Sequence, residues 1–235
     1  MITNSENWRC KVVSFSGIDG AGKSTQIINL QANMKAFGLR VQLITFWDDI
    51  ARFTRIREIT GQTLFQGDKG VGTPAAPINR RDKNVRSWLM TLIRLGIYFV
   101  DAVSLRIALK KALRSDVDFV IFDRYIYDEL ANLTLHNSVI RIYARFIMKV
   151  TPRPDISYLL DSDPVQARAR KPEYPIEFLY FCRASYLTLS DLVPGGMTVI
   201  PPMPLQDVGR LVLQYSQNLF SAEGIQREQT TNSLG

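Results

Sequence analysis

The segment from Gly17 to Thr25 constrains the fold of this chain more than any other part of the sequence. It reads GIDGAGKST, so that four residues separate Gly17 from Gly22, and Lys23 and Ser24 follow directly. A short apolar run precedes the segment and a helical pattern follows it, which is the context of a P-loop. The backbone amides of such a loop and the N-terminal end of its helix surround a phosphate chain. The segment therefore predicts a phosphate-binding loop between a strand and a helix.

The side chains at the end of this loop fit a nucleotide that is bound together with magnesium. The Lys23 ammonium can reach the terminal phosphates, and the Ser24 hydroxyl can ligate Mg²⁺. We expect Thr25 to begin the helix. The predicted phosphate site comprises consecutive residues of the loop and the helix start, namely Gly17, Ile18, Asp19, Gly20, Ala21, Gly22, Lys23, Ser24 and Thr25.

Apolar runs alternate with helical patterns along the rest of the chain. The runs at residues 10–16, 41–46, 119–122, 156–160 and 197–200 are apolar enough for strands that are buried on both faces. Strands that alternate with helices form a parallel sheet with helices on both sides. We therefore predict an α/β fold of the P-loop NTPase type with a five-stranded parallel sheet. Its ligands should bind outside the carboxyl ends of the strands.

The length of 235 residues fits one domain. We expect a polar lead-in at residues 1–9, a P-loop domain at 10–220 and a disordered tail at 221–235. Within the domain, residues 67–86 form an irregular basic insert. Residues 168–177 form a short lid that can fold over the strand ends.

The formal net charge of +7 favours anionic partners. No segment shows the basic and aromatic alternation of a single-strand binder, which argues against nucleic acid as the main ligand. The two cysteines lie far apart in predicted core elements, which indicates reduced thiols and a cytoplasmic protein. The long apolar stretch at 88–109 contains Arg94, Asp101 and Arg106, and such charges are costly in a bilayer. We therefore predict one buried helix, or two consecutive helices, and no membrane span.

Several motifs in the same order make the chain resemble the thymidylate kinase family of P-loop nucleoside monophosphate kinases. FSGIDGAGKST at 15–25 is similar to the phosphate loop of that family, and DRY at 123–125 to its strand-end motif. RPD and LLD within 153–161 resemble the strand before its lid. ARAR at 167–170 and RASYL at 183–187 resemble the lid and the helix after it.

The resemblance covers roughly residues 10–215 and makes the predicted domain a P-loop kinase domain. It implies an ATP-dependent phosphotransferase that transfers the γ-phosphoryl group of ATP to a nucleoside monophosphate, by default dTMP to dTDP, in nucleotide biosynthesis. ATP and Mg²⁺ are the implied cofactors, and a small-molecule nucleotide is the implied acceptor. A homodimer is also consistent with the resemblance.

The resemblance assigns catalytic roles to the loop, the strand end and the lid. Lys23 would hold the donor phosphates, Arg124 would grip the acceptor phosphate, and Asp19 would orient the reacting groups. Some family members carry an arginine at the position of Gly20, and others supply this charge from the lid. The chain resembles the second type. The lid cations that would neutralise charge in the transition state are then Arg168, Arg170 and Lys171.

Two further sites follow from the same resemblance. Asp123 would help Ser24 to bind magnesium through water. Arg183 lies where the family packs an arginine against adenine, with Pro202 and Met203 as other walls. From the residues alone, Asp123 with Arg124 also fits an ordinary ion pair at a strand end, and the lid arginines also fit a solvated helix face.

The acceptor half of the chain departs from the family pattern. After the second strand the family has Arg-Glu-Pro, whereas residues 47–49 read WDD. The base-reading arginine of the family aligns with Ala102, and a serine that follows the DRY motif aligns with Asp128. A buried polar group left unpaired costs about 1–3 kcal/mol, so phosphoryl transfer is better supported than thymidylate specificity. The predicted acceptor site comprises Trp47, Asp48, Asp49, Tyr98, Asp101, Arg124, Tyr125 and Asp128.

Two alternative functions remain open. Asp48 or Asp49 could be the general base toward a hydroxyl acceptor such as a deoxynucleoside, or both could only cap the following helix. The insert at 67–86, which the family lacks in this form, would instead suit a non-catalytic nucleotide-binding switch or partner protein. The intact Lys23 and Ser24 argue against that last function.

Overall fold

A computed structural model of the chain describes residues 9–51, 88–133 and 135–232. Five strands form one sheet in the order β2-β3-β1-β4-β5, and all four pairings are parallel. This arrangement confirms the predicted five-stranded parallel sheet. The strands are β1 (Lys11–Ser16), β2 (Val41–Thr45), β3 (Phe119–Asp123), β4 (Ile156–Leu160) and β5 (Thr198–Ile200).

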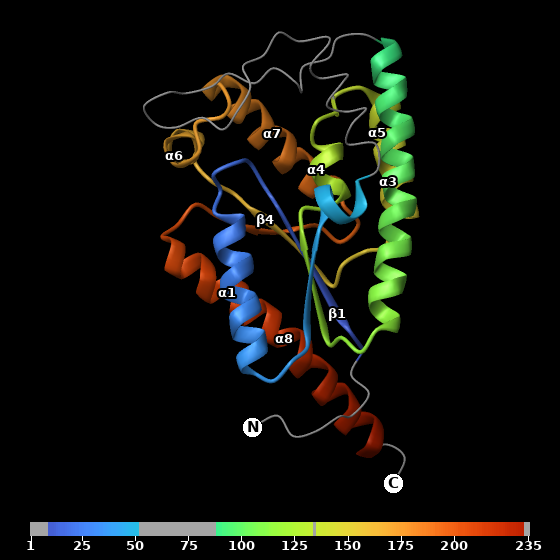
Figure 1. Cartoon of the computed structure of the whole chain (residues 1–235), viewed down its shortest axis with the longest axis vertical. Helices are drawn as coiled ribbons and strands as arrows, with labels where there is room; N and C mark the ends of the chain where they lie inside the picture. Colours follow the sequence, from blue (N-terminus) through green and yellow to red (C-terminus); the bar gives the residue numbers. More distant parts are fainter. Residues whose placement is uncertain (1–8, 52–87, 134, 233–235) are drawn as a thin grey trace.

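Helices cover both faces of the sheet. Helices α1 and α8 lie on one side, and α3, α4, α5 and α7 lie on the other (Figure 1). Helix α6 lies beyond the carboxyl ends of the strands, near the start of α1 (Figure 1). The helices are α1 (Lys23–Ala36), a single π-helical turn η1 (Phe46–Ile50), α3 (Trp88–Arg114), α4 (Ile126–Leu130), α5 (Ser138–Val150), α6 (Pro164–Arg170), α7 (Ile176–Leu192) and α8 (Leu205–Asn232).

Two apolar cores explain why the strands could be recognised from the sequence. Successive side chains of a strand point to opposite faces of the sheet. Val13 and Phe15 of β1 pack in the core under α1 and α8, whereas Val12 packs in the core on the other side. Because both faces are buried, each strand reads as a nearly continuous apolar run.

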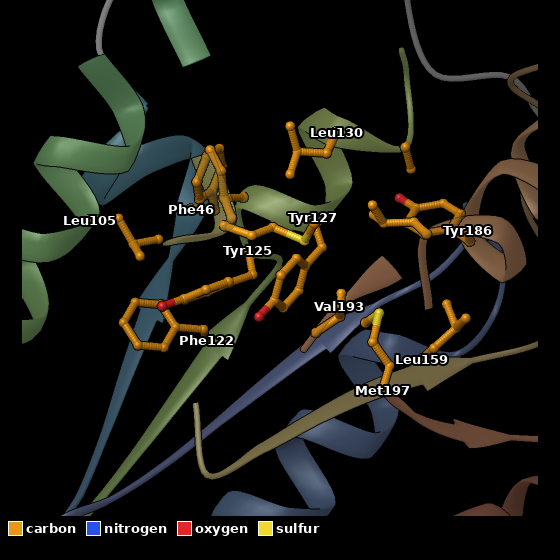
Figure 2. Packing of buried hydrophobic residues seen from close by; sticks show 14 of the residues in the cluster. Phe46, Leu105, Phe122, Tyr125, Tyr127, Leu130, Leu159, Tyr186, Val193 and Met197 are labelled. Atoms are coloured by element: carbon orange, nitrogen blue, oxygen red, sulfur yellow. The ribbon is translucent and has the colours of Figure 1, made fainter. Parts of the chain in front are cut away.

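The core on the side of α3, α4, α5 and α7 extends to the carboxyl end of β3, where Phe122 and Tyr125 lie. Figure 2 shows Phe46, Leu105, Phe122 and Tyr125 within it, contributed by four different elements of the chain. The rings of Phe122 and Tyr125 meet edge to face with their centroids 5.2 Å apart. This packing fixes η1, α3 and the segment after β3 relative to one another.

Two segments differ from or refine the predictions. The apolar stretch that begins at residue 88 forms one continuous helix, and no helix in the described parts of the chain is long and apolar enough to cross a membrane. Helix α8 continues to Asn232, so it includes much of the tail at 221–235 that we expect to be disordered. Good helix formers such as Ala, Glu, Gln and Arg in that segment favour continuation of the helix. The insert at 67–86 and residues 1–8 lie outside the described residues.

The outer surface of α3 and α5 carries several exposed apolar side chains. Phe99 of α3 and Phe146 of α5 are exposed, and their rings stack with centroids 6.2 Å apart. Val103 and Ile107 continue this exposed stripe along α3. A homodimer would need a face of this kind, and the dimer itself stays a prediction.

Truncation of a side chain on the inner face of α3 should lower the free energy of unfolding far more than truncation of one on the outer face. Leu105 is 0% exposed and Ile107 is 59% exposed. We expect Leu105→Ala to lower the free energy of unfolding by about 2–5 kcal/mol, because it leaves a cavity in the core. Ile107→Ala should change it by only about 0.5 kcal/mol. Urea unfolding of both variants tests the orientation of α3, and equal losses would contradict it.

Candidate active site

The glycine-rich loop joins β1 to α1 and is packed against two neighbours. Gly17, Gly20 and Gly22 have φ angles of 141°, 83° and 89°, which L side chains rarely adopt. A Cβ atom at Gly17 would lie 2.5 Å from the carbonyl oxygen of Leu160, and one at Gly20 would lie 2.2 Å from that of Ala167. The loop therefore touches the end of β4 and the backbone of α6 with no side chain between them.

Lys23 lies along this loop. Its Nζ donates hydrogen bonds to the carbonyl oxygens of Gly17 at 2.7 Å and Ile18 at 2.9 Å, and the side chain is buried. Burial, reinforced by the nearby charge of Arg124, lowers the pKa of Lys23 from 10.5 to about 7. Ser24 is exposed beside it at the start of α1. An anion at this helix end would meet both side chains and the free N–H groups of the first turn.

Arg124 is fixed at the end of β3 by its backbone and by two carboxylates. Its φ angle is 67°, and its N–H donates to the Phe15 carbonyl oxygen at 3.0 Å. The guanidinium pairs with Asp19 of the loop through Nη2 and with Asp128 Oδ1 through Nη1 at 3.1 Å. Burial alone would lower the pKa of Arg124, but the two carboxylates outweigh it and the net shift is upward. The side chain therefore carries a full positive charge beside the loop.

The carboxylate of Asp128 accepts three further hydrogen bonds. Its Oδ2 accepts from Ser16 Oγ at 2.7 Å and from the Tyr125 N–H at 3.1 Å, and its Oδ1 accepts from the Tyr186 hydroxyl at 2.8 Å. Asp128 is thus enclosed at 2% exposure. Its burial argues against the direct acceptor contact that the sequence predicts for it.

Tyr125 also differs from its predicted role. The side chain is fully buried, and its hydroxyl donates to the Pro152 carbonyl oxygen. Tyr98 and Asp101 are likewise buried on the inner side of α3, where Asp101 lies near Tyr143 of α5. These three side chains are buried in this conformation, and their contact with an acceptor stays a prediction.

The two aspartates of η1 have different environments. Asp49 Oδ2 accepts a hydrogen bond from the Thr45 N–H at 2.7 Å, so this carboxylate holds the turn to the end of β2. Asp48 is exposed. Burial raises the pKa of Asp123, and Asp48 is among the nearby charges that raise it further. Asp48 and Asp123 therefore lie on the same side of the site, and π-helical turns such as η1 are frequent at functional sites.

The residues near the strand ends fit a magnesium ion that arrives with a nucleotide. Ser24 and Asp123 supply a hydroxyl and a carboxylate, and Mg²⁺ typically takes one or two protein oxygens in addition to phosphate oxygens and water. In the described parts of the chain, no group of three or more His, Cys, Asp or Glu side chains could hold a metal by itself. This donor set suits a substrate-borne ion better than a permanent metal centre.

The lid side chains divide into two groups. Arg170 donates to Ser162 Oγ at 2.9 Å and lines a cavity of about 50 Å³, whereas Arg168 lies half-buried on α6. Pro202 and Met203, the predicted adenine walls, line the same cavity, together with Ala21 of the loop. Arg183 lies outside its lining and forms a two-bond ion pair with Asp161, at 2.6 and 2.7 Å. The structure thus brings three of the predicted residues together beside the loop.

Two contributors to the site were not predicted. Tyr186 belongs to the RASYL motif, and Ser16 precedes the loop, yet nothing in their spacing indicated a contact with Asp128. Ser16 and Asp128 are 112 positions apart in the chain, and Asp128 and Tyr186 are 58 positions apart. Only the three-dimensional arrangement of β1, α4 and α7 creates them.

The sheet order, the glycine-rich loop between β1 and α1, and the short helix α6 against that loop define the class of this protein as a P-loop NTPase fold with a lid. The sequence matches no protein-family model and no curated protein. Among solved structures, the chain is similar to a thymidylate kinase from Ehrlichia chaffeensis, with a TM-score of 0.56 and 18% sequence identity. The match covers 88% of this chain and 98% of that chain. The family resemblance is therefore confirmed at the level of the fold.

The contact between Gly20 and α6 can be tested against a glycine with the same backbone angle. Gly20 and Gly38 both have φ of +83°, but a Cβ at Gly38 would meet nothing within 4 Å. We expect Gly38→Ala to cost about 1–2 kcal/mol of stability from backbone strain alone. Gly20→Ala should cost clearly more, because it also pushes α6 away from the loop. Urea unfolding measures both values, and equal losses would refute the close contact.

The lowered pKa of Lys23 predicts a pH dependence of stability. Between about pH 7 and 10.5 the unfolded chain binds one more proton than the folded chain, so stability should rise with pH. Lys23→Met removes this contribution, which amounts to at most about 1.4 kcal/mol per pH unit. The comparison by urea unfolding should stay below about pH 8. The Cys10 thiol, whose pKa burial raises from 9.0 to about 11, ionises in the unfolded chain around pH 9.0. A variant with the same pH dependence as the native protein would contradict the prediction.

Proposed function

We propose that this protein is an ATP-dependent phosphotransferase that acts on a small nucleotide. The observation that carries the proposal is the arrangement of Lys23, Asp19 and Arg124. Lys23 binds two carbonyl oxygens of the phosphate-binding loop, and the partly buried, fully charged Arg124 pairs with Asp19 of the same loop. Phosphoryl transfer requires mainly positioning and charge stabilisation, and these groups supply both.

Each side chain has a defined task in this proposal. The loop amides and Lys23 bind the donor phosphates, for which the lysine exchanges its two carbonyl partners for phosphate oxygens. Magnesium held by Ser24 and Asp123 would neutralise charge on the donor phosphates. Arg124 binds the acceptor phosphate in line with the donor, and Arg168 and Arg170 approach from the lid. The cavity beside Pro202 accommodates one edge of the adenine base.

We propose a nucleoside monophosphate, with dTMP as the first choice, as the acceptor. The support is the likeness in fold to a thymidylate kinase together with the charged Arg124. A hydroxyl acceptor such as a deoxynucleoside is the second candidate. It is favoured by Asp48, which is exposed near Asp123 and is therefore available as a base, whereas Asp49 is engaged with Thr45.

An acceptor screen tests this proposal. Coupled ADP release would be measured with ATP and Mg²⁺ across dTMP, other nucleoside monophosphates, nucleosides and water. Turnover with dTMP about tenfold above all other acceptors supports the first choice, and turnover with nucleosides alone supports the second. Lys23→Ala should abolish turnover with either acceptor. ATP binding without turnover on any acceptor would refute a phosphotransferase and favour a nucleotide-binding switch.

Two variants separate the candidate acceptors. Arg124→Ala should mainly damage use of a phosphate acceptor, because it removes the cation that faces the phosphate. Asp48→Asn should mainly damage use of a hydroxyl acceptor, because it removes the base. Asp118→Asn, which alters an ion pair with Arg40 at the opposite end of β3, is the matched control and should leave turnover unchanged.

A further inference from the structure

Asp128 is the most heavily bonded carboxylate among the described residues of the site. It binds four groups from three parts of the chain, namely the Arg124 guanidinium, the Ser16 hydroxyl, the Tyr125 N–H and the Tyr186 hydroxyl. Its side chain is 1% exposed. A buried carboxylate is costly unless it is paired and fully hydrogen-bonded, and this one meets both conditions.

The position of Asp128 matters because Arg124 is held in an unfavourable conformation. Arg124 is the only described residue other than glycine with a positive φ angle. Such a backbone conformation persists when several surrounding interactions hold it in place. Residues with this conformation are concentrated at functional sites. The Arg124 N–H is bound to β1, and its guanidinium is bound to Asp128, so both ends of the residue are fixed.

Serine, which stands at this position in the family that the chain resembles, could not supply the same interaction. A serine hydroxyl is short and uncharged, whereas the carboxylate reaches the guanidinium and forms a charge-assisted hydrogen bond with it. The carboxylate also links β1 to α7 through Ser16 and Tyr186. Arg124 is therefore oriented by the strand before the loop and by the helix after the lid.

We propose that Asp128 is a positioning residue that presents the Arg124 guanidinium to the acceptor. The Arg124 side chain is 16% exposed, so a small anion can approach it, whereas the Asp128 side chain is 1% exposed. Asp19 holds the other terminal nitrogen and lies on the loop, so an acceptor phosphate meets an arginine that is already directed toward the donor. This inference rests on the proposed phosphotransferase function.

Asp128→Asn is the decisive variant, because it keeps the shape of the side chain and removes the charge. We expect the KM for the acceptor to rise about tenfold or more, since the arginine must now be ordered on binding. The KM for ATP should stay within about twofold, because Lys23 and the loop amides are unchanged. Loss of general stability would not produce this difference between the two substrates. Asp118→Asn again serves as the ion-pair control.

A second measurement does not depend on turnover. The side-chain Nε–H signal of Arg124 in a nitrogen-15 NMR spectrum, assigned by its disappearance in Arg124→Lys, reports whether the guanidinium is held. It should be sharp in the native protein without nucleotide and broadened or lost in Asp128→Asn. If the native protein turns over no acceptor, the phosphotransferase proposal fails, and this signal still decides whether Asp128 positions Arg124.

If Asp128→Asn does not fold, a second variant that keeps the carboxylate tests the proposal. Tyr186→Phe removes one hydrogen bond from Asp128, and we expect a rise of about threefold in the acceptor KM and a broader Arg124 signal. An unchanged acceptor KM, or an Arg124 signal that stays sharp, in either folded variant would overturn the proposal.

Discussion

The parallel pairing of β1 with β3 and β4 is the interaction on which the site depends. In this register Phe15 lies beside Asp123, and Ser16 lies beside Leu159. The glycine-rich loop therefore begins where β3 and β4 end, and the Arg124 N–H extends the ladder by one bond to Phe15. Because the two apolar cores fix this central strand on both faces, the loop and the backbone of Arg124 are held side by side.

Much of this arrangement could be predicted, because the signals are local. Burial on both faces makes the strands continuous apolar runs, and the spacing of the glycines with Lys23 identifies the loop. The role of Tyr125 could not be predicted in the same way, since its ring is buried by helices from other parts of the chain. The hydrogen bond that Asp49 accepts from the Thr45 N–H was also not predicted, because a sequence pattern does not distinguish an acid that caps the next helix from one that holds the preceding strand.

The balance of charge near the loop supports the proposal that a nucleotide binds there together with its metal ion. Four carboxylates, those of Asp19, Asp48, Asp123 and Asp128, lie in the neighbourhood of Lys23 and Arg124. Burial lowers the pKa of Lys23 and raises that of Asp123, because it disfavours the charged form of each group. A phosphate chain and a divalent ion, entering together, would supply a partner to both.

The contact of Gly20 with the Ala167 carbonyl has a consequence for how this fold can diverge. A loop arginine and a lid that rests on the loop compete for the same space, because even one additional carbon at position 20 would collide with the backbone of α6. The two ways of supplying positive charge are thus mutually exclusive on steric grounds. With α6 this close to the loop, an arginine could replace Gly20 only if the helix moved, so a single substitution would not be enough.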